Sequence, residues 1–301
     1  MRLLHVTHRS GFEHDTGLVH PERPARLRAA AAGVAAAGLD VEAIEADPLV
    51  AADLTIVHDR DYVEAIRRFC AAGGGDLDPD TPVSSGSWNA ALAAAGAGPT
   101  AVARLENGFE GPAFISVRPP GHHALPNRAM GFCLFNNVAV TAARLRAQGR
   151  RVAIVDWDVH HGNGTQAMFI SDPDLLYSSL HQFPFYPYGG AVTEIGEGAG
   201  VGTTVNIPLP ALTAGDVYLE AFVQIVMPSL IAFHPDWVLV SSGFDGHAHD
   251  PLAELRLSEA DYASMSRLLS QVVAANRTIV FMEGGYHLPA IRDSVTALVR
   301  A

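Results

Sequence analysis

The chain has 301 residues, 49% of them hydrophobic and 17% charged, which is the composition of a folded globular protein with a sizeable core. A formal net charge of −12 argues against nucleic acid as a partner, because binding phosphates requires clustered basic side chains. The two cysteines match no disulfide framework, the N-terminus does not resemble a signal peptide, and no apolar run approaches the roughly 18 residues that a membrane span requires, so we expect a cytoplasmic protein with no membrane partner.

Short apolar runs alternate with helical stretches along the chain. The runs that we predict as strands are 3–6, 113–117, 151–157, 175–180, 203–209, 237–242 and 278–285. The predicted helices are 23–37, 87–107, 137–148, 216–233 and 258–275. Most strand candidates are continuously apolar, as is typical of parallel strands covered on both faces. We therefore predict an α/β fold in which residues 1–301 form a single domain, with an open, mostly parallel sheet flanked by helices on both faces.

Polar residues cluster directly after four of the predicted strands. The segments are "RPPGHHA" (118–124), "DWDVHHGNG" (156–164), "GFDGHAHD" (243–250) and "EGGYH" (283–287). Open parallel sheets bind their ligands at the carboxyl ends of the strands. Four such segments at one edge therefore predict a functional site there.

Asp158 and His160 are the first candidates for metal ligands. Residues two apart at a strand end project to the same side, and Asp245 is the best third ligand. A set of carboxylate and imidazole ligands without thiolate suits Zn²⁺, Fe²⁺ or Mn²⁺, and three protein ligands leave a position open for catalysis. An isolated Asp-x-His is more often structural; here the second acidic loop and the tight turns allowed by Gly162 and Gly164 favour a metal site.

Other polar residues of these segments suit proton transfer. An exposed pair such as His122 and His123 is usually surface, but beside a metal site imidazoles accept and donate protons. Asp156 would either bind the metal or hydrogen-bond an imidazole, and Asn163 could orient the second imidazole. Tyr286 follows two glycines; it is either a packed aromatic or a hydroxyl donor to an oxygen that gains charge in the transition state.

With these residues assembled, the sequence resembles the histone deacetylase and acetylpolyamine amidohydrolase superfamily, which has the arginase-like fold. The motifs that carry the resemblance are collinear and span most of the chain: "HPERP" (20–24), "DTPVS" (80–84), "RPPGHHA" (118–124), "GFCLFNN" (131–137), "DWDVHHGNGT" (156–165), "SLH" (179–181), "VNIPL" (205–209), "SSGFDGHAHDPL" (241–252) and "EGGY" (283–286). Tyr286 and Asn163 are similar to their counterparts in class II-type deacetylases and bacterial relatives.

The resemblance implies a deacetylase mechanism and assigns a role to each matching residue. One catalytic zinc ion would be held by Asp158, His160 and Asp245. Proton transfer and carbonyl binding would fall to the general base His122 oriented by Asp156, the proton donor His123 paired with Asn163, and Tyr286. His161 would support the site without binding the ion.

The resemblance also implies potassium ions and an acyl-lysine tunnel. One potassium would lie among Asp156, Asp158, His160, Ser179 and Leu180, and a second near Phe169, Asp172 and Leu175. The tunnel would be formed by Gly131, Phe132, Tyr186 and Leu252, with either Asp78 or Asp80 as the acid at its rim.

Several functions are compatible with this site. The main expectation is zinc-dependent removal of acetyl or other short acyl groups from acyl-lysine or small acetylated amines. Alternatives are an acetylpolyamine amidohydrolase, a non-catalytic acyl-lysine-binding protein and an arginase-like hydrolase with two manganese ions. Leu252 stands where polyamine-specific relatives place a rim acid, which favours acyl-lysine substrates. A homo-oligomer is compatible with a chain of this kind.

Overall fold

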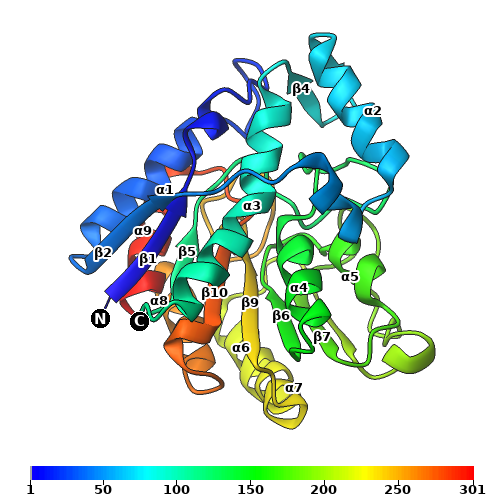
Figure 1. Ribbon diagram of the computed structural model, residues 1–301. Helices are drawn as coiled ribbons and strands as arrows, with labels where there is room; N and C mark the ends of the chain where they lie inside the picture. Colours follow the sequence, from blue (N-terminus) through cyan, green and yellow to red (C-terminus); the bar gives the residue numbers. More distant parts are fainter. Residues whose placement is uncertain (1) are drawn as a thin grey trace.

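The computed structural model describes residues 2–301, and this part of the chain contains an eight-stranded parallel sheet. The order of its strands is β2-β1-β5-β10-β9-β6-β7-β8 (Figure 1). Their bounds are β1 Arg2–Thr7, β2 Asp40–Glu45, β5 Ala113–Ile115, β6 Val152–Asp156, β7 Leu175–Gln182, β8 Thr204–Leu209, β9 Trp237–Ser242 and β10 Thr278–Met282. Met1, the first residue of the predicted 1–301 domain, lies outside the described residues. A strand is found at each of the seven predicted positions, although β5 and β10 end earlier than predicted, and three further strands, β2, β3 (Gly74–Asp76) and β4 (Pro82–Ser84), were not predicted.

Helices cover both faces of this sheet, as predicted (Figure 1). The α-helices are α1 Ala25–Ala36, α2 Arg60–Ala71, α3 Ser87–Glu106, α4 Asn137–Ala147, α5 Asn163–Phe169, α6 Gly215–Ala221, α7 Met227–Phe233, α8 Glu259–Leu269 and α9 Leu288–Arg300. Four short 3₁₀ segments are η1 Arg9–Phe12, η2 Ala51–Ile56, η3 Gly198–Gly200 and η5 Ala275–Arg277, and a π-helical segment, η4 Phe222–Val226, joins α6 to α7. A separate antiparallel hairpin pairs β3 Gly74–Asp76 with β4 Pro82–Ser84.

The apolar runs are continuous because successive side chains of a strand enter different cores. In β9, Val238 and Val240 pack with α1, α6, α8 and α9, whereas Trp237 and Leu239 pack with α3 and α4. The strand is buried along its whole length. Burial on both faces removes the polar alternation that a half-exposed strand would show.

Within residues 2–301, one helical stretch, Gly215–Phe233, has the length and mean hydropathy, 1.5, of a membrane span. This differs from our expectation that no such run exists. The stretch has no unbroken apolar run of that length because Asp216 and Glu220 interrupt it, yet its mean hydropathy is high. One third of the stretch, 33%, is buried, and Phe222 and Leu230 on that face pack against the sheet.

The strand order brings the predicted polar segments to one edge of the sheet. Strands β5, β10, β9 and β6 are consecutive neighbours, and all their pairings are parallel. Asp156, at the end of β6, is in register with Ser241 of β9, and Ser242 is in register with Met282 of β10. The loops that follow these strands therefore meet at the carboxyl edge.

Candidate active site

Asp158, His160 and Asp245 converge on one point at this edge. Nδ1 of His160 lies 3.0 Å from Oδ1 of Asp158 and 3.2 Å from Oδ2 of Asp245. Ligand atoms that share a tetrahedral zinc ion lie about 3.3 Å apart, given metal–ligand distances of about 2.0 to 2.1 Å. Among residues 2–301, this is the one group of three or more acidic, histidine or cysteine side chains with the spacing of a metal site.

The surroundings of these three residues also fit a bound cation. Oδ2 of Asp245 is buried and has no hydrogen-bond partner among the described residues. Two glycines leave space for the carboxylates: a Cβ at Gly284 would collide with Asp245, and one at Gly243 would collide with Asp158. Buried, unpaired carboxylate oxygens are costly unless an ion neutralises them. The oxygen and nitrogen donors suit zinc and its borderline neighbours.

The electrostatics of the cluster favour positive charge. Burial disfavours a charged imidazole, but the adjacent carboxylates of Asp158 and Asp245 outweigh it and raise the pKa of His160 to about 10. Burial and the negative charge of Asp158 raise the pKa of Asp245. A divalent cation would relieve both effects, because it replaces the proton between the carboxylates.

Asp156 holds His122 rather than joining the three candidate ligands. Its Oδ2 lies 3.0 Å from Nδ1 of His122 and accepts a hydrogen bond from the Tyr177 hydroxyl at 3.2 Å. Of the two roles left open for Asp156, its contacts match the hydrogen bond to an imidazole. Burial opposes charge on the His122 ring, but the carboxylates of Asp156 and Asp158 outweigh it and raise the pKa of His122 to about 10.

His123 lies beside His122 in a different electrostatic environment. The two ring centroids are 4.0 Å apart, and Nδ1 of His123 lies 2.8 Å from Oδ1 of Asn163, the first residue of α5. Burial, followed by the charges of His122 and His160, lowers the pKa of His123 well below its usual value. A neutral amide orients His123, whereas a carboxylate orients His122, so the two imidazoles differ in basicity.

Glu283 fixes the loop that carries both histidines, and our sequence analysis assigned it no role. Its Oε2 accepts hydrogen bonds from the N–H groups of Gly121, at 2.7 Å, and His122, at 3.3 Å. The burial of its carboxyl group raises the pKa of Glu283 to about 7. The only sequence signal was its place in "EGGY", directly before the glycines.

A cavity of about 270 Å³ opens onto His122, His123 and His160. Its other lining residues are Asp80, Pro120, Gly131, Phe132, Cys133, Phe185, Tyr186, Leu252, Gly284 and Tyr286. The predicted tunnel residues Gly131, Phe132, Tyr186 and Leu252 are thus brought together. Of the two candidate rim acids, Asp80 lines the cavity, while Asp78 accepts a hydrogen bond from the N–H of Asp80 at 3.1 Å.

Aromatic rings form the walls of this cavity. Phe132 packs edge-on against Tyr286, with centroids 5.8 Å apart. Phe185, which the sequence analysis missed, stacks on His160 at 5.3 Å with an interplanar angle of 21°. Gly131 and Phe132 both have positive φ angles, 56° and 67°, and a Cβ at Gly131 would collide with the His123 ring. The backbone at Gly131 therefore requires glycine.

The residues of the first expected potassium site lie at the carboxyl ends of β6 and β7, and those of the second lie at the turn between α5 and β7. Ser179 is paired with Asp156 in neighbouring strands, and the carbonyl of Leu180 accepts a hydrogen bond from the Tyr218 hydroxyl at 3.2 Å. Phe169, Asp172 and Leu175 share the turn from α5 to β7, where the carbonyls of Phe169 and Asp172 accept backbone hydrogen bonds. The Asp172 carboxylate pairs with Arg146 at 2.9 Å.

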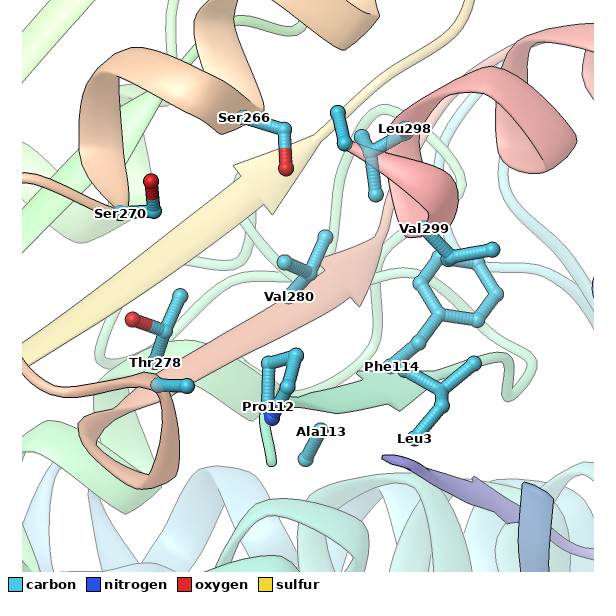
Figure 2. Close-up of a pocket in the computed structure, with 12 residues that line it drawn as sticks. Leu3, Pro112, Ala113, Phe114, Ser266, Ser270, Thr278, Val280, Leu298 and Val299 are labelled. Carbon is cyan, nitrogen blue, oxygen red and sulfur yellow. The ribbon is translucent and has the colours of Figure 1, made fainter. Parts of the chain in front are cut away.

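A second cavity, shown in Figure 2, lies at the opposite edge of the sheet. The two chain termini, marked in Figure 1, lie near it. It measures about 80 Å³ and lies between the first residues of β1, β5 and β10 and the ends of α8 and α9. Apart from the Ser266, Ser270 and Thr278 hydroxyls, the side chains that line it are apolar (Figure 2). It has no ionisable side chain, so the chemistry belongs to the carboxyl edge.

Comparisons with known proteins agree with this geometry. Residues 20–301 match the family model of the histone deacetylase domain. An uncharacterised protein of Synechocystis sp. is 42% identical over 296 residues, covering 96% of this chain and 95% of the relative. The histone deacetylase-like amidohydrolase of Pseudomonas aeruginosa is 42% identical over 80% of this chain, and histone deacetylase 15 of Arabidopsis thaliana is 41% identical over 93%. The matches span 65% and 52% of those two proteins. The crystal structure of the HDA15 HD domain superposes with a TM-score of 0.93 at 38% identity, covering 98% of this chain and 89% of that one.

Proposed function

The chain belongs to the histone deacetylase family, and from that premise we propose that it is a zinc-dependent amidohydrolase acting on acyl-lysine side chains or small acetylated amines. The observation that carries the proposal is that one cavity is lined by His160 of the three-ligand cluster, by the carboxylate-paired His122 and by Tyr286. Acetyl and other short acyl groups would be released. We further propose that the whole chain is one catalytic domain acting in the cytoplasm.

The chain's own residues would divide the work of amide hydrolysis. Zinc held by Asp158, His160 and Asp245 would lower the pKa of water to about 7 and polarise the amide carbonyl. His122, whose basicity the Asp156 carboxylate raises, would accept a proton at Nε2. His123, oriented by Asn163, would assist proton delivery to the departing amine. The Tyr286 hydroxyl would donate a hydrogen bond to the carbonyl oxygen as that oxygen gains negative charge.

The cavity walls support an acyl-lysine substrate. Phe132, Phe185 and Tyr186 offer apolar faces to a four-methylene stem. Asp80, which lines the cavity, would serve as the rim acid and accept hydrogen bonds from a substrate backbone. Leu252, which is 36% exposed, brings no charge to the mouth, and Asp80 is the one acid among the lining residues, whereas further acids there would favour a polyamine. We therefore propose acyl-lysine as the substrate in preference to acetylpolyamines.

We also propose that potassium ions bind near Ser179 and near Phe169 and have a structural role.

One observation weighs against an arginase-like hydrolase with two manganese ions. Such a site needs carboxylates beyond those of a single ion, yet within residues 2–301 only the cluster of Asp158, His160 and Asp245 has metal-site spacing. The carboxylate of Asp156, two residues before Asp158, instead makes hydrogen bonds with His122 and Tyr177.

A turnover panel tests the proposal. Zinc-loaded protein is assayed against acetyl-lysine peptides, longer acyl-lysine peptides and acetylpolyamines, with acetate release as the readout. Tyr286→Phe should lower kcat by about a hundredfold or more while zinc content stays constant, because it removes one donor to the oxyanion. Tyr188→Phe is the matched control, since Tyr188 is 80% exposed. A zinc-loaded protein that released acetate from none of the substrates would refute the proposal, and full activity in Tyr286→Phe would refute this role for the tyrosine.

A further inference from the structure

The loop of residues 183–197, which we call the wall loop, carries Phe185 and Tyr186 between β7 and β8. Phe185 stacks on His160, but the large apolar side chains farther along the loop, Tyr188, Val192 and Ile195, are all exposed and anchor it little. Polar contacts must therefore hold the part of the wall loop that follows Tyr186.

The Glu194 carboxylate makes three of these contacts. Its Oε1 accepts hydrogen bonds from the N–H groups of Gly190, at 3.1 Å, and Ala191, at 2.9 Å. Its Oε2 accepts a hydrogen bond from Nε2 of Gln166, at 2.6 Å. Partial burial opposes the charged form, but these hydrogen bonds outweigh it and lower the pKa of Glu194. The carboxylate thus closes the wall loop on itself and ties it to α5.

Gln166 connects Glu194 to His161, which follows the candidate ligand His160 in the chain. A carboxylate can only accept hydrogen bonds, so the amide nitrogen of Gln166 must face Glu194 and its oxygen must face the other way. That oxygen accepts from Nε2 of His161, at 2.9 Å, and from Nδ2 of Asn206, at 2.7 Å. His161 therefore carries its proton on Nε2. Its Nδ1 has no partner among the described residues, and the next residue back is the candidate ligand His160.

The wall loop also packs closely on His161, together with the neighbouring ring of His181. Nε2 of His181 lies 2.9 Å from the carbonyl oxygen of Gly190, and the His181 ring is 4.8 Å from that of His161. Gly190 has a φ of 85°, and a Cβ there would collide with both rings. The wall loop is therefore in close contact with His161, the residue that follows the candidate ligand His160.

We infer that Glu194 and Gln166 are positioning residues that set the distance between the aromatic wall, Phe185 and Tyr186, and the metal cluster. The inference rests on the proposed function, because it assigns a purpose to the cavity. Neither side chain lines the cavity. Both would act through the residues they hold.

Variants of the wall loop test this inference in the zinc-loaded protein. Glu194→Ala should raise KM for an acetyl-lysine peptide by about tenfold, the equivalent of one charge-assisted hydrogen bond, with a smaller change in kcat. Glu197→Ala is the matched control: it removes the same charge from the same loop, and the Glu197 side chain makes no hydrogen bond within residues 2–301. Glu194→Gln alone should be defective, because two amide nitrogens would then face each other.

A double exchange separates positioning from a general loss of charge. Glu194→Gln combined with Gln166→Glu keeps every hydrogen bond of the chain with donor and acceptor reversed at one contact, so KM should return to within about threefold of the wild-type value. Hydrogen exchange of residues 183–197, measured without substrate, should accelerate in Glu194→Ala and not in Glu197→Ala.

The outcomes distinguish this inference from the proposed function. If wild-type protein deacylates, and Glu194→Ala matches Glu197→Ala in KM and in hydrogen exchange, the positioning role is wrong. Failure of the double exchange to improve on Glu194→Gln also overturns it. If wild-type protein releases no acetate, the proposed function fails, while the exchange data still decide whether Glu194 holds the loop.

Discussion

At the scale of single residues, a buried cluster of Glu22, Arg26 and Arg118 contacts the loop that carries Tyr286. The Glu22 carboxylate accepts hydrogen bonds from Arg118 at 2.6 Å and from Arg26 at 2.9 Å, and all three side chains are buried. Nε of Arg26 donates to the carbonyl of Gly285 at 2.6 Å, and its guanidinium lies 5.0 Å from the Tyr286 ring. The cluster thus joins the segment before α1 to the loop that carries Tyr286.

Replacing Glu22 should destabilise the protein strongly. Glu22→Gln would leave two buried guanidinium groups short of negative charge, which should cost about 3 to 5 kcal/mol in the free energy of unfolding. Glu64→Gln is the control, because Glu64 pairs with Arg67 at the surface, where such pairs contribute roughly 0 to 1 kcal/mol. Denaturant unfolding at pH 7 measures both values. Equal stability of the two variants would contradict this account.

The same residue predicts a pH dependence of stability. Burial opposes ionisation, but the charges of Arg118 and Arg26 lower the pKa of Glu22 to about 2, from 4.5. A carboxyl group whose pKa is lower in the folded state stabilises fully above its unfolded pKa. Its contribution should therefore be complete above about pH 4.5 and be lost as the pH falls towards about 2. Unfolding measured between those values should show a steeper loss in wild type than in Glu22→Gln.

At the scale of elements, the ends of β9 and β10 are shaped around the candidate ligands. The N–H of Gly284 donates to Oδ2 of Asp158 at 2.7 Å, and a Cβ at this position would collide with Asp245. The turn after β10 therefore supplies both a hydrogen bond to one ligand and space for another.

A methyl group at this turn should weaken metal binding. We expect Gly284→Ala to lower zinc affinity by at least about tenfold, because outer contacts that orient ligands contribute that much. Gly189→Ala is the control, since a Cβ there meets nothing nearer than His161, at 3.5 Å. Competition with a chromophoric chelator reports the affinity, and circular dichroism reports whether each variant folds. Unchanged affinity in a folded Gly284→Ala would refute the steric argument.

The sequence predicted elements that are buried on both faces better than elements at the periphery. Strands such as β9 are continuously apolar and bounded by polar motifs, so their ends, and the meeting of four loops, could be inferred. The edge strand β2, "DVEAIE", alternates with acids and is half exposed, and α5 begins inside a polar motif. Glu22 and Glu283 were missed because their partners lie far along the chain; Glu22 and Arg118 are 96 residues apart. Phe185 was missed because it lies in a loop outside the polar motifs.

At the scale of the whole molecule, metal binding should be linked to stability. A ligand that binds only the folded chain stabilises it by about 2.7 kcal/mol at a hundredfold excess over its Kd. Zinc should therefore raise Tm by several degrees, and a chelator should reverse the shift. Asp245→Asn should reduce the zinc-dependent shift, because it removes the charge of one candidate ligand. A shift of the same size in that variant would place the ion elsewhere.

The strand order has a consequence for how the protein is made. Strands β9 and β10 are the last along the chain, yet they lie between β5 and β6 in the sheet. Until β9 and β10 have left the ribosome, β5 and β6 each have one edge whose backbone hydrogen-bonding groups are unpaired. Exposed edges of this kind pair with other chains. Asp245 and Tyr286 also arrive after every other catalytic candidate. In a nascent chain, His122, His123 and His160 are therefore synthesised early. The metal cluster is complete only after β9 and β10 have inserted between β5 and β6.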